Sequence, residues 1–350
     1  MDWRENVRMV TPYVAGEQPK ISDIIKLNTN ESPYPPSPKV GAGMASLDAG
    51  LLRLYPDPNC TVLVDALADY YGLTPEQVFV GVGSDDVLAL AYLTFFNSKK
   101  PLLFPDVSYS FYDVWAELYR IPYQTVPLDD DFGINQEDYL RDNGGIIFPN
   151  PNAPTGVFEN LDLVEYIVKN NSDSIVIIDE AYIDFGGVSA LKLIDKYSNL
   201  LVVQTFSKSR AMAGIRIGYA MGNPELIKYL SDAKFSFNSY TMNLTSLTLG
   251  GLAVLDDAYF KEITAKIINT REWFGKELTR LGFSYPKSCA NFIFATHPEI
   301  KAAELFLKLK ESGIYVRYFN QPRIDNYLRI TIGTDEEMRK VVEFLNKYNV

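Results

Sequence analysis

Runs of three or four consecutive apolar residues alternate along this chain with longer stretches in which apolar residues recur every three or four positions. The short runs are typical of strands buried on both faces of a sheet, and the longer stretches are typical of helices that bury one face. The expected strands lie at residues 78–80, 102–104, 146–148, 175–178 and 200–203, and the expected helices at 62–70, 87–96, 109–119, 161–169 and 180–196. These repeated strand–turn–helix units predict an α/β fold with a mostly parallel sheet covered by helices on both faces.

The pattern changes after residue 245. A long helical stretch is expected at 246–281, where Gly282 follows. Beyond it, the expected strands lie at 291–294, 314–317 and 327–331, and the expected helices at 299–311 and from 335 onward. Near the N-terminus, six prolines between positions 12 and 38 argue against a long helix or a central strand, so an ordered arm is expected there.

These segments predict a chain of four parts. They are an N-terminal arm at 1–45 that contributes to the small domain and to a dimer contact, a large α/β domain at 46–245, a connecting helix at 246–281 and a small α+β domain at 282–350. Parallel α/β sheets bind ligands at the carboxyl ends of their strands, and pockets are frequent between domains. We therefore expect the functional site in a cleft between the two domains.

Charge and composition narrow the possible functions. The 350 residues carry a formal net charge of −11, which argues against nucleic acid or an anionic membrane as a partner. The single histidine, His297, makes a His-rich metal site impossible and leaves no Ser–His triad unless it serves in one, so no metal is predicted. Cys60 and Cys289 are expected to be reduced thiols, and neither a signal core nor an apolar run of membrane length occurs. These features predict a cytoplasmic protein.

Lys208 is the candidate catalytic residue of the chain. Lys208 follows the apolar run 200–203 in a hydroxyl-rich turn, with Ser207 and Arg216 nearby as possible partners for an anion. A lysine at the carboxyl end of a buried strand can be partly desolvated, which favours the neutral amine that attacks a carbonyl to form a Schiff base. Taken alone, a lysine in such a turn is more often a solvated surface charge.

Two loops after other predicted strands suit a phosphate or a flat ligand. The turn Gly81-Val-Gly-Ser-Asp85 leads into a helix, and its glycines, the Ser84 hydroxyl and the free helix N–H groups suit a phosphate. A tight turn with a helix cap would explain it equally well. The constrained loop Asn150-Pro-Asn-Ala-Pro-Thr-Gly156 places the Asn152 amide at the ligand edge of the sheet, where it can donate a hydrogen bond.

Further candidates follow two more strands. Asp179 comes after four apolar residues, so its carboxylate is expected to be buried and to need a partner such as a protonated pyridine nitrogen. Tyr182 could donate its phenol toward the same ring. A metal ligand or a structural salt bridge would explain Asp179 equally well. Tyr109, near the start of a predicted helix, could stack on a flat ligand or pack in the core.

The ordered set of segments resembles a known family. The chain is similar to the fold-type I pyridoxal-phosphate aminotransferases and, within them, to the histidinol-phosphate aminotransferase family, across nearly its whole length. The segments that carry the resemblance are Leu27-Asn-Thr-Asn-Glu31, Gly83-Ser-Asp85, Asn150-Pro-Asn-Ala-Pro-Thr-Gly156, Asp179-Glu-Ala-Tyr182, Thr205-Phe-Ser-Lys208, Gly214-Ile-Arg-Ile-Gly-Tyr219 and Tyr327-Leu-Arg-Ile-Thr-Ile-Gly333. The chain departs from the family pattern at Val82, Asp86 and Ala153, where the family usually has Asn, Glu and Asn.

The resemblance implies roles for the residues around the cofactor, pyridoxal 5′-phosphate. Lys208 would bind the cofactor covalently and move the proton at the substrate Cα, and Asp179 would pair with the pyridine nitrogen. Asn152 and Tyr182 would hydrogen-bond the ring oxygen, and Tyr109 would stack on the ring.

The resemblance also implies which residues bind anions. Those that would hold the cofactor phosphate are Gly83, Ser84, Asp85, Ser207 and Arg216, joined by Tyr55, which would reach the cofactor of a neighbouring subunit in a homodimer. Those that would bind the substrate are Arg329, Arg317, Tyr13 and Asn152.

The implied activity is amino transfer between L-histidinol phosphate and 2-oxoglutarate, giving imidazole acetol phosphate and L-glutamate in histidine biosynthesis. Two arginines near one site would fit a phosphomonoester and a dicarboxylate. An aromatic amino acid aminotransferase would share every cofactor residue, and threonine-phosphate decarboxylase also resembles this family and binds an amine-bearing phosphate. A non-catalytic regulatory domain could keep the fold, but Lys208 is present and no basic N-terminal module occurs.

Overall fold

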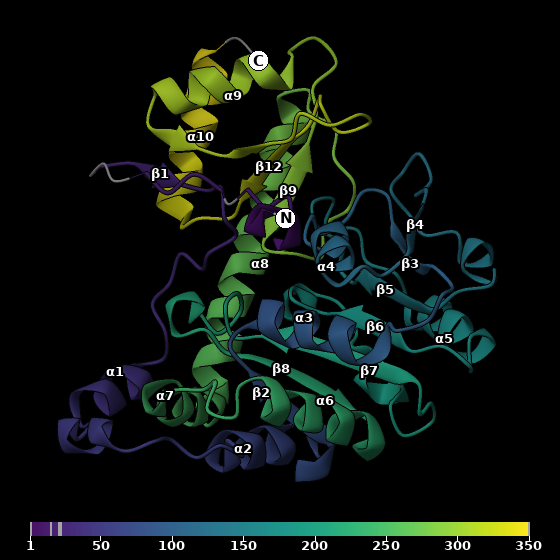
Figure 1. Cartoon of the computed structure of the whole chain (residues 1–350). Coiled ribbons are helices and arrows are strands. Elements are labelled where there is room, and N and C mark those ends of the chain that lie inside the picture. Colours follow the sequence, from purple (N-terminus) through teal and green to yellow (C-terminus); the bar gives the residue numbers. More distant parts are fainter. Residues whose placement is uncertain (1, 15, 20–22, 349–350) are drawn as a thin grey trace.

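A computed structural model describes residues 2–14, 16–19 and 23–348 of the chain (Figure 1). The lower half of the molecule in Figure 1 is built on a seven-stranded sheet, and the upper half on two small sheets. The long helix α8 (Asp257–Arg280) runs from one half to the other. In the described part of the chain, we find no helix with the length and hydropathy needed to cross a membrane.

The large sheet has a mixed but mostly parallel order. Its strands, in spatial order, are β2 (Val78–Gly81), β8 (Gly218–Gly222), β7 (Leu200–Thr205), β6 (Val176–Asp179), β5 (Gly145–Pro149), β3 (Leu102–Pro105) and β4 (Tyr123–Val126). Only β8 runs antiparallel to its neighbours, and the pairs from β7 to β4 are all parallel. The predicted α/β fold with a mostly parallel sheet is confirmed.

Alternate residues of the central strands build a core on each face of the large sheet. In β7, Leu201 and Val203 belong to one core, whereas Leu200 and Val202 belong to the other. The helices on the first face are α3 (Ser84–Phe95), α4 (Tyr112–Tyr119) and α6 (Pro224–Phe237), and those on the second are α2 (Thr61–Tyr71), α5 (Leu161–Asn170) and α7 (Leu244–Val254). All six residues of β7 are buried, which explains its continuous apolar sequence.

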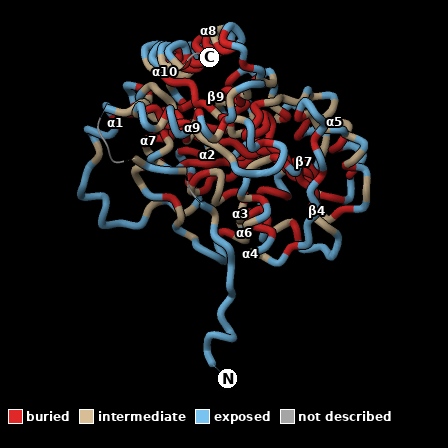
Figure 2. Tube along the Cα trace, turned by 90° about the horizontal axis from the view of Figure 1, so that it is seen from above, coloured by how far each residue is buried: buried red, intermediate tan, exposed pale blue. Residues whose placement is uncertain are grey.

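The second half of the molecule packs its own core around the end of α8. Its strands are β1 (Ile25–Lys26), β9 (Phe292–Ala295), β10 (Ile314–Tyr315), β11 (Arg317–Tyr318) and β12 (Leu328–Thr331), and its helices are α9 (Ala302–Glu311) and α10 (Asp335–Lys347). β1 pairs with β10, so the N-terminal arm adds a strand to the C-terminal part of the chain. Figure 2 shows most of residues 2–14 as an exposed segment that leaves the buried core.

Two expected helices are interrupted. The stretch expected as one helix at 246–281 is split between α7 and α8, because the backbone of Asp256 leaves the helical region (φ −109°, ψ 56°). The helical piece expected up to residue 196 consists of two short 3-10 turns, η5 (Ile183–Phe185) and η6 (Ala190–Leu193). Gly186 lies between them with a φ of +124°, a conformation that no helix continues through.

Five regular elements were not expected from the pattern, and the first is the short strand β1 in the N-terminal arm. Helix α1 (Pro38–Ala45) lies in the proline-rich arm, where Pro38 occupies the first helical turn that tolerates proline. Strand β4 is missed because three of its four residues are exposed, and β8 because it begins and ends with glycine. Helix α6 also starts with a proline. The remaining short 3-10 turns are η1 (Trp3–Asn6), η2 (Ala49–Arg53), η3 (Pro75–Gln77), η4 (Gln136–Tyr139) and η7 (Ala213–Ile215).

The division into four parts at residues 45, 245 and 281 stays a prediction. Residues 1, 15, 20–22 and 349–350, which belong to its first and last parts, lie outside the described residues.

Candidate active site

Loops that follow several strands of the large sheet meet at its carboxyl edge and enclose a cavity of about 180 Å³. The predicted site residues that line this cavity are Ser84, Asp85, Tyr109, Asp179, Tyr182, Ser207, Lys208 and Arg216. The other lining residues are Thr29, Glu31, Pro149, Ala153, Ala181, Thr205 and Ala213. An amine, a buried carboxylate and a guanidinium therefore face one small space.

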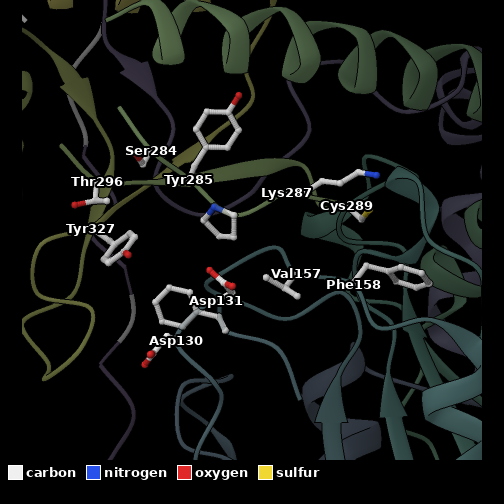
Figure 3. Close-up of a pocket in the computed structure, with 12 residues that line it drawn as sticks. Asp130, Asp131, Val157, Phe158, Ser284, Tyr285, Lys287, Cys289, Thr296 and Tyr327 are labelled. Carbon is white, nitrogen blue, oxygen red and sulfur yellow. The ribbon is translucent and has the colours of Figure 1, made fainter. Parts of the chain in front are cut away.

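A larger pocket of about 460 Å³ lies elsewhere, between the segments 130–132 and 284–289 (Figure 3). Asp130, Asp131 and Lys287 line it, but none of the predicted site residues does. The smaller cavity is the candidate active site, because it collects the groups that acid–base and covalent chemistry need.

Two backbone hydrogen bonds stabilise the turn that carries Lys208. The Phe206 N–H donates to the carbonyl of Ile217, and the Met212 N–H donates to the carbonyl of Phe206. The Lys208 Nζ donates to the carbonyl oxygen of Thr29 at 3.3 Å and lies 5.7 Å from the centre of the Tyr182 ring. Its amine thus stands at the cavity wall, held by a single hydrogen bond to the described residues.

Asp179 ends β6 and is only 4% exposed. Its Oδ2 accepts a hydrogen bond from the Tyr112 hydroxyl at 3.0 Å, and its Oδ1 accepts one from the Ala181 N–H at 3.3 Å. Burial raises the pKa of Asp179 to about 6, and these two hydrogen bonds oppose the rise. Within the described residues, Asp179 forms no salt bridge, although the charge of Lys208 also opposes the rise in its pKa.

The other end of the cavity is suited to an anion. Arg216 Nη2 lies 3.4 Å from Asp85 Oδ2, and the Thr205 and Ser207 hydroxyls are 3.0 Å apart. Gly83 is not among the lining residues, but a Cβ there would lie 2.4 Å from Arg216 Nη2. The missing side chain, together with a φ of +84°, lets the Arg216 guanidinium lie against the turn.

The hydroxyl group of each of the two aromatic candidates takes part in one hydrogen bond. Tyr109 donates to Asp85 Oδ1 at 2.8 Å, and its ring is 5.5 Å from that of Phe111. The Tyr182 hydroxyl accepts a hydrogen bond from Asn30 Nδ2 at 2.9 Å. Both rings are therefore fixed at the cavity wall.

Asn152 is not among the residues that line the cavity. Its Nδ2 donates to the Val107 carbonyl at 3.0 Å and to the Thr155 hydroxyl at 2.9 Å, so both amide hydrogens are engaged. Its buried Oδ1 has no hydrogen-bond partner in the described part of the chain. The role of Asn152 as a donor to a ring oxygen, or to substrate, stays a prediction.

The predicted substrate residues lie outside the cavity lining. Arg317 and Arg329 stand directly opposite each other on β11 and β12. Arg329 donates from Nη2 to the Asn28 carbonyl at 3.1 Å, whereas its buried Nε has no partner within the described residues. Burial lowers the pKa of Arg329, and the charge of Arg317 adds to that effect. Tyr13 stacks on Phe111 with ring centres 4.1 Å apart.

Tyr55 lies on the surface, far from complete burial. Its side chain is 82% exposed, and its ring stacks on that of Tyr240 at 4.6 Å. It does not line the cavity of its own chain.

The segment 28–31 joins the cavity to the far end of the chain. The Asn30 N–H donates to the Thr331 hydroxyl at 3.1 Å across 301 positions of sequence, and Asn291 Nδ2 donates to the Asn30 carbonyl at 2.9 Å. Thr29 and Glu31 of the same segment line the cavity. One wall of the cavity is therefore held by strands near the C-terminus.

Among the residues that were not singled out from the sequence, Thr29 and Thr205 line the cavity, and Tyr112 hydrogen-bonds Asp179 without lining it. Thr205 and Thr29 stand inside segments that carried the family resemblance, so their positions were visible but not their contacts. Tyr112 is the first residue of α4, whereas Tyr109 precedes that helix, and no sequence pattern singled out Tyr112.

Comparison with known proteins agrees with this geometry. The family model for aminotransferase class I and II matches residues 22–345. A histidinol-phosphate aminotransferase of Lactococcus lactis subsp. cremoris (strain MG1363) is 53% identical over 348 residues, which are 99% of this chain and 98% of that protein. The histidinol-phosphate aminotransferase 1 of Hydrogenovibrio crunogenus (strain DSM 25203 / XCL-2) is 55% identical over 336 residues, 96% of this chain and 94% of that protein.

Solved structures share the fold. The crystal structure of histidinol-phosphate aminotransferase from Sinorhizobium meliloti in complex with pyridoxal-5′-phosphate has a TM-score of 0.84 at 23% identity, covering 93% of this chain and 91% of that chain. Because the family model spans most of the sequence and the relatives exceed 50% identity over almost all of it, this chain belongs to the aminotransferase class I and II family.

Proposed function

We propose that this protein transfers an amino group between L-histidinol phosphate and 2-oxoglutarate, with pyridoxal phosphate as cofactor. The aminotransferase class I and II family depends on this cofactor. The observation that carries the reaction is the meeting of Lys208, Asp179 and Arg216 at one cavity. The names of relatives at 53% and 55% identity support the choice of histidinol phosphate as donor.

The residues present fit pyridoxal phosphate. Arg216 and the hydroxyls of Thr205 and Ser207 form the donor set that a phosphate needs. Asp179 is buried without a cationic partner in the described part of the chain, and a protonated ring nitrogen supplies one. Lys208 brings an amine within the same cavity. Donors for a phosphate, an amine and a buried carboxylate therefore line one cavity, and these are the groups that this molecule requires.

When bound, pyridoxal phosphate supplies an aldehyde carbon that captures an amine and a ring that withdraws electrons from the substrate Cα. Lys208 would hold the cofactor through its amine and, once the substrate amine has displaced it, would take the proton from the substrate Cα. No histidine lines the cavity to do this. Asp179 stabilises positive charge on the ring nitrogen, because a buried carboxylate attracts a cation more strongly than an exposed one. Tyr109 shields one side of the cavity from water.

The two opposed arginines support anionic substrates. Like charges placed directly opposite on neighbouring strands destabilise a sheet, and an anion bound near Arg317 and Arg329 would offset that repulsion. Histidinol phosphate brings a phosphate in one half-reaction, and 2-oxoglutarate brings two carboxylates in the other. We therefore assign both arginines to substrate binding.

A donor panel tests the substrate. Histidinol phosphate, phenylalanine, tyrosine and threonine phosphate are each offered with 2-oxoglutarate, and both glutamate and CO2 are followed. We expect histidinol phosphate to exceed the aromatic donors in kcat/KM by at least about 100-fold, because a site built for a phosphate rejects donors that leave it empty. A preference for phenylalanine would contradict the proposal, and so would CO2 release from threonine phosphate.

The same assay tests the arginine assignment. Arg329→Lys keeps the charge but loses the planar fork, so kcat/KM for histidinol phosphate is expected to fall roughly 10- to 100-fold. The matched control is Arg339→Lys, at an exposed position on α10. An unchanged kcat/KM for Arg329→Lys would remove this residue from the substrate site.

We also propose a homodimer in which Tyr55 completes the partner's site. Large exposed apolar side chains gather around it, and such patches mark interfaces. They are Leu51, Leu52, Leu54, Phe237 and Tyr240, of which Leu52 is 67% and Phe237 is 76% exposed. The stacking of Tyr55 on Tyr240 places both segments on one surface.

Mixing two inactive variants tests this dimer. In a dimer of Lys208→Ala with Tyr55→Ala, one site keeps its own lysine and receives an intact tyrosine from the partner. Random mixing is expected to restore about a quarter of the wild-type rate, because half of the dimers are mixed and each has one complete site. A monomer in light scattering, or a mixture as inactive as its parts, would contradict the shared site.

We propose a cytoplasmic location on the basis of the two free cysteines, Cys60 and Cys289, which are typical of a reducing compartment. Recovery of the protein in a membrane or secreted fraction of its cells would contradict it.

A further inference from the structure

The Asp179 carboxylate is held from two sides, and the two donors differ in origin. The Ala181 N–H belongs to the turn that follows Asp179 itself, at 3.3 Å from Oδ1. The Tyr112 hydroxyl, at 3.0 Å from Oδ2, belongs to α4 and comes from 67 positions away. Tyr112 is thus the contact that ties the carboxylate to a different element of the fold.

The Tyr112 ring is fixed in place by its surroundings. The residue is completely buried, and four aromatic rings surround it, including that of Tyr92. The ring centres lie 5.8 Å from Phe104 of β3, 5.8 Å from Tyr109 and 6.3 Å from Trp115. Because this packing restrains the ring, the Tyr112 hydroxyl is held within hydrogen-bonding distance of Asp179 Oδ2.

The chemistry of the pair favours an ionised carboxylate. Burial raises the pKa of Tyr112 well above its usual value, so its hydroxyl keeps its proton and acts as a donor. Burial also raises the pKa of Asp179 to about 6, and the hydrogen bond from Tyr112 is the largest effect that opposes this rise. A carboxylate that receives such a bond is better able to stay charged in a site with little water.

We propose that Tyr112 is a positioning residue of this enzyme, whose hydroxyl holds the Asp179 carboxylate ionised and turned toward the ring nitrogen of the cofactor. Tyr112 does not line the cavity and acts only through Asp179. The inference rests on the role proposed above for Asp179.

A second buried tyrosine provides a matched control. Tyr92 of α3 is as completely buried as Tyr112, and their ring centres are 6.5 Å apart. The Tyr92 hydroxyl has no hydrogen-bond partner in the described part of the chain. Tyr92→Phe therefore removes the same atom from the same aromatic core without removing a bond to Asp179.

Cofactor affinity is the principal measurement, because it does not depend on the amino donor. Apoprotein of the wild type, Tyr112→Phe, Tyr92→Phe, Asp179→Asn and the double variant Tyr112→Phe/Asp179→Asn is titrated with pyridoxal phosphate, and quenching of protein fluorescence gives Kd. Tyr112→Phe is expected to raise Kd roughly tenfold, the effect of losing a hydrogen bond to a charged group, while Tyr92→Phe stays within about twofold of the wild type. In the Asp179→Asn background, Tyr112→Phe is expected to add no more than about twofold.

A steady-state measurement separates positioning from packing. Tyr112→Phe is expected to lower kcat about tenfold with KM for 2-oxoglutarate within about twofold of the wild type, because the substrate contacts are untouched. The melting temperature of each apoprotein checks that folding is preserved.

Three results would overturn the inference. The first is an equal Kd for Tyr112→Phe and Tyr92→Phe while Asp179→Asn binds weakly, which removes Tyr112 but leaves Asp179 in its role. The second is that Tyr112→Phe raises Kd for pyridoxal phosphate as much in the Asp179→Asn background as in the wild type, or that it lowers the melting temperature without changing Kd. Either result shows that Tyr112 serves packing alone. The third is a wild-type Kd for Asp179→Asn, which removes the proposed role of Asp179 as well. A different preferred donor would alter none of these Kd values.

Discussion

Replacement of Lys208 with alanine is expected to lower the rate of amino transfer by about four orders of magnitude or more, because one side chain both binds the cofactor and moves the proton. The only hydrogen bond of its amine in the described structure is to the Thr29 carbonyl, so the substitution removes little that holds the fold. The wild type should show the visible absorbance of lysine-bound pyridoxal phosphate, and Lys208→Ala should lack it while still retaining cofactor in the cavity.

Lys208→Arg is the control for charge. Arginine keeps the positive charge at this place but does not act as a nucleophile or as a base near neutral pH. We expect it to be as inactive as Lys208→Ala. Circular dichroism spectra and melting temperatures should match the wild type for both variants. Turnover within tenfold of the wild type for either would remove Lys208 from the reaction.

Asp179→Asn is expected to change activity and stability in opposite directions. Amino transfer should fall roughly 100- to 1,000-fold, since a neutral amide does not stabilise positive charge on the ring nitrogen. The apoprotein, however, should become more stable above pH 6, because burial raises the folded-state pKa of Asp179 from 3.8 to about 6. That shift corresponds to at most about 3 kcal/mol of destabilisation of the wild type when the group is charged.

The pH dependence of the free energy of unfolding tests whether the Asp179 carboxylate causes this difference in stability. Between about pH 4 and pH 6 the unfolded wild-type chain has already released the Asp179 proton while the folded chain still binds it, so wild-type stability falls as pH rises through this window. Asp179→Asn should lack that contribution. Burial also raises the pKa values of Glu180 and Asp184, so a slope from these two acids should remain in both proteins. Urea denaturation of the apoproteins at pH 5 and pH 8 measures the difference, and an equal difference at both values would contradict the assignment.

The central strands could be predicted from the sequence because burial on both faces leaves a continuous apolar run, as in β7. Strand β8 could not be predicted in this way. A Cβ at its first residue, Gly218, would lie 2.2 Å from the backbone of Gly83, so glycine is needed where β8 approaches the turn at residues 81–85. Close backbone packing therefore requires glycine at a position where an apolar residue would have indicated a strand.

Side-chain contacts within the site were the least predictable part. The positions of Lys208 and Asp179 follow from their places after apolar runs, and both line the cavity. The hydrogen bonds from the Asn152 amide to Val107 and Thr155 could not be predicted from the sequence, because they depend on how two loops pack together. The same holds for the bond between Tyr112 and Asp179, which joins positions 67 residues apart.

The wall formed by residues 28–31 has a consequence for biosynthesis of the molecule. This segment is synthesised before its partner, because Thr331 follows Asn30 by 301 positions. The cavity is therefore unfinished until β12 has been made, and a nascent chain that already contains Lys208 and Asp179 lacks a complete place for the cofactor. Because contacts so distant in sequence form slowly, we expect the proposed cofactor to bind at a late stage of folding.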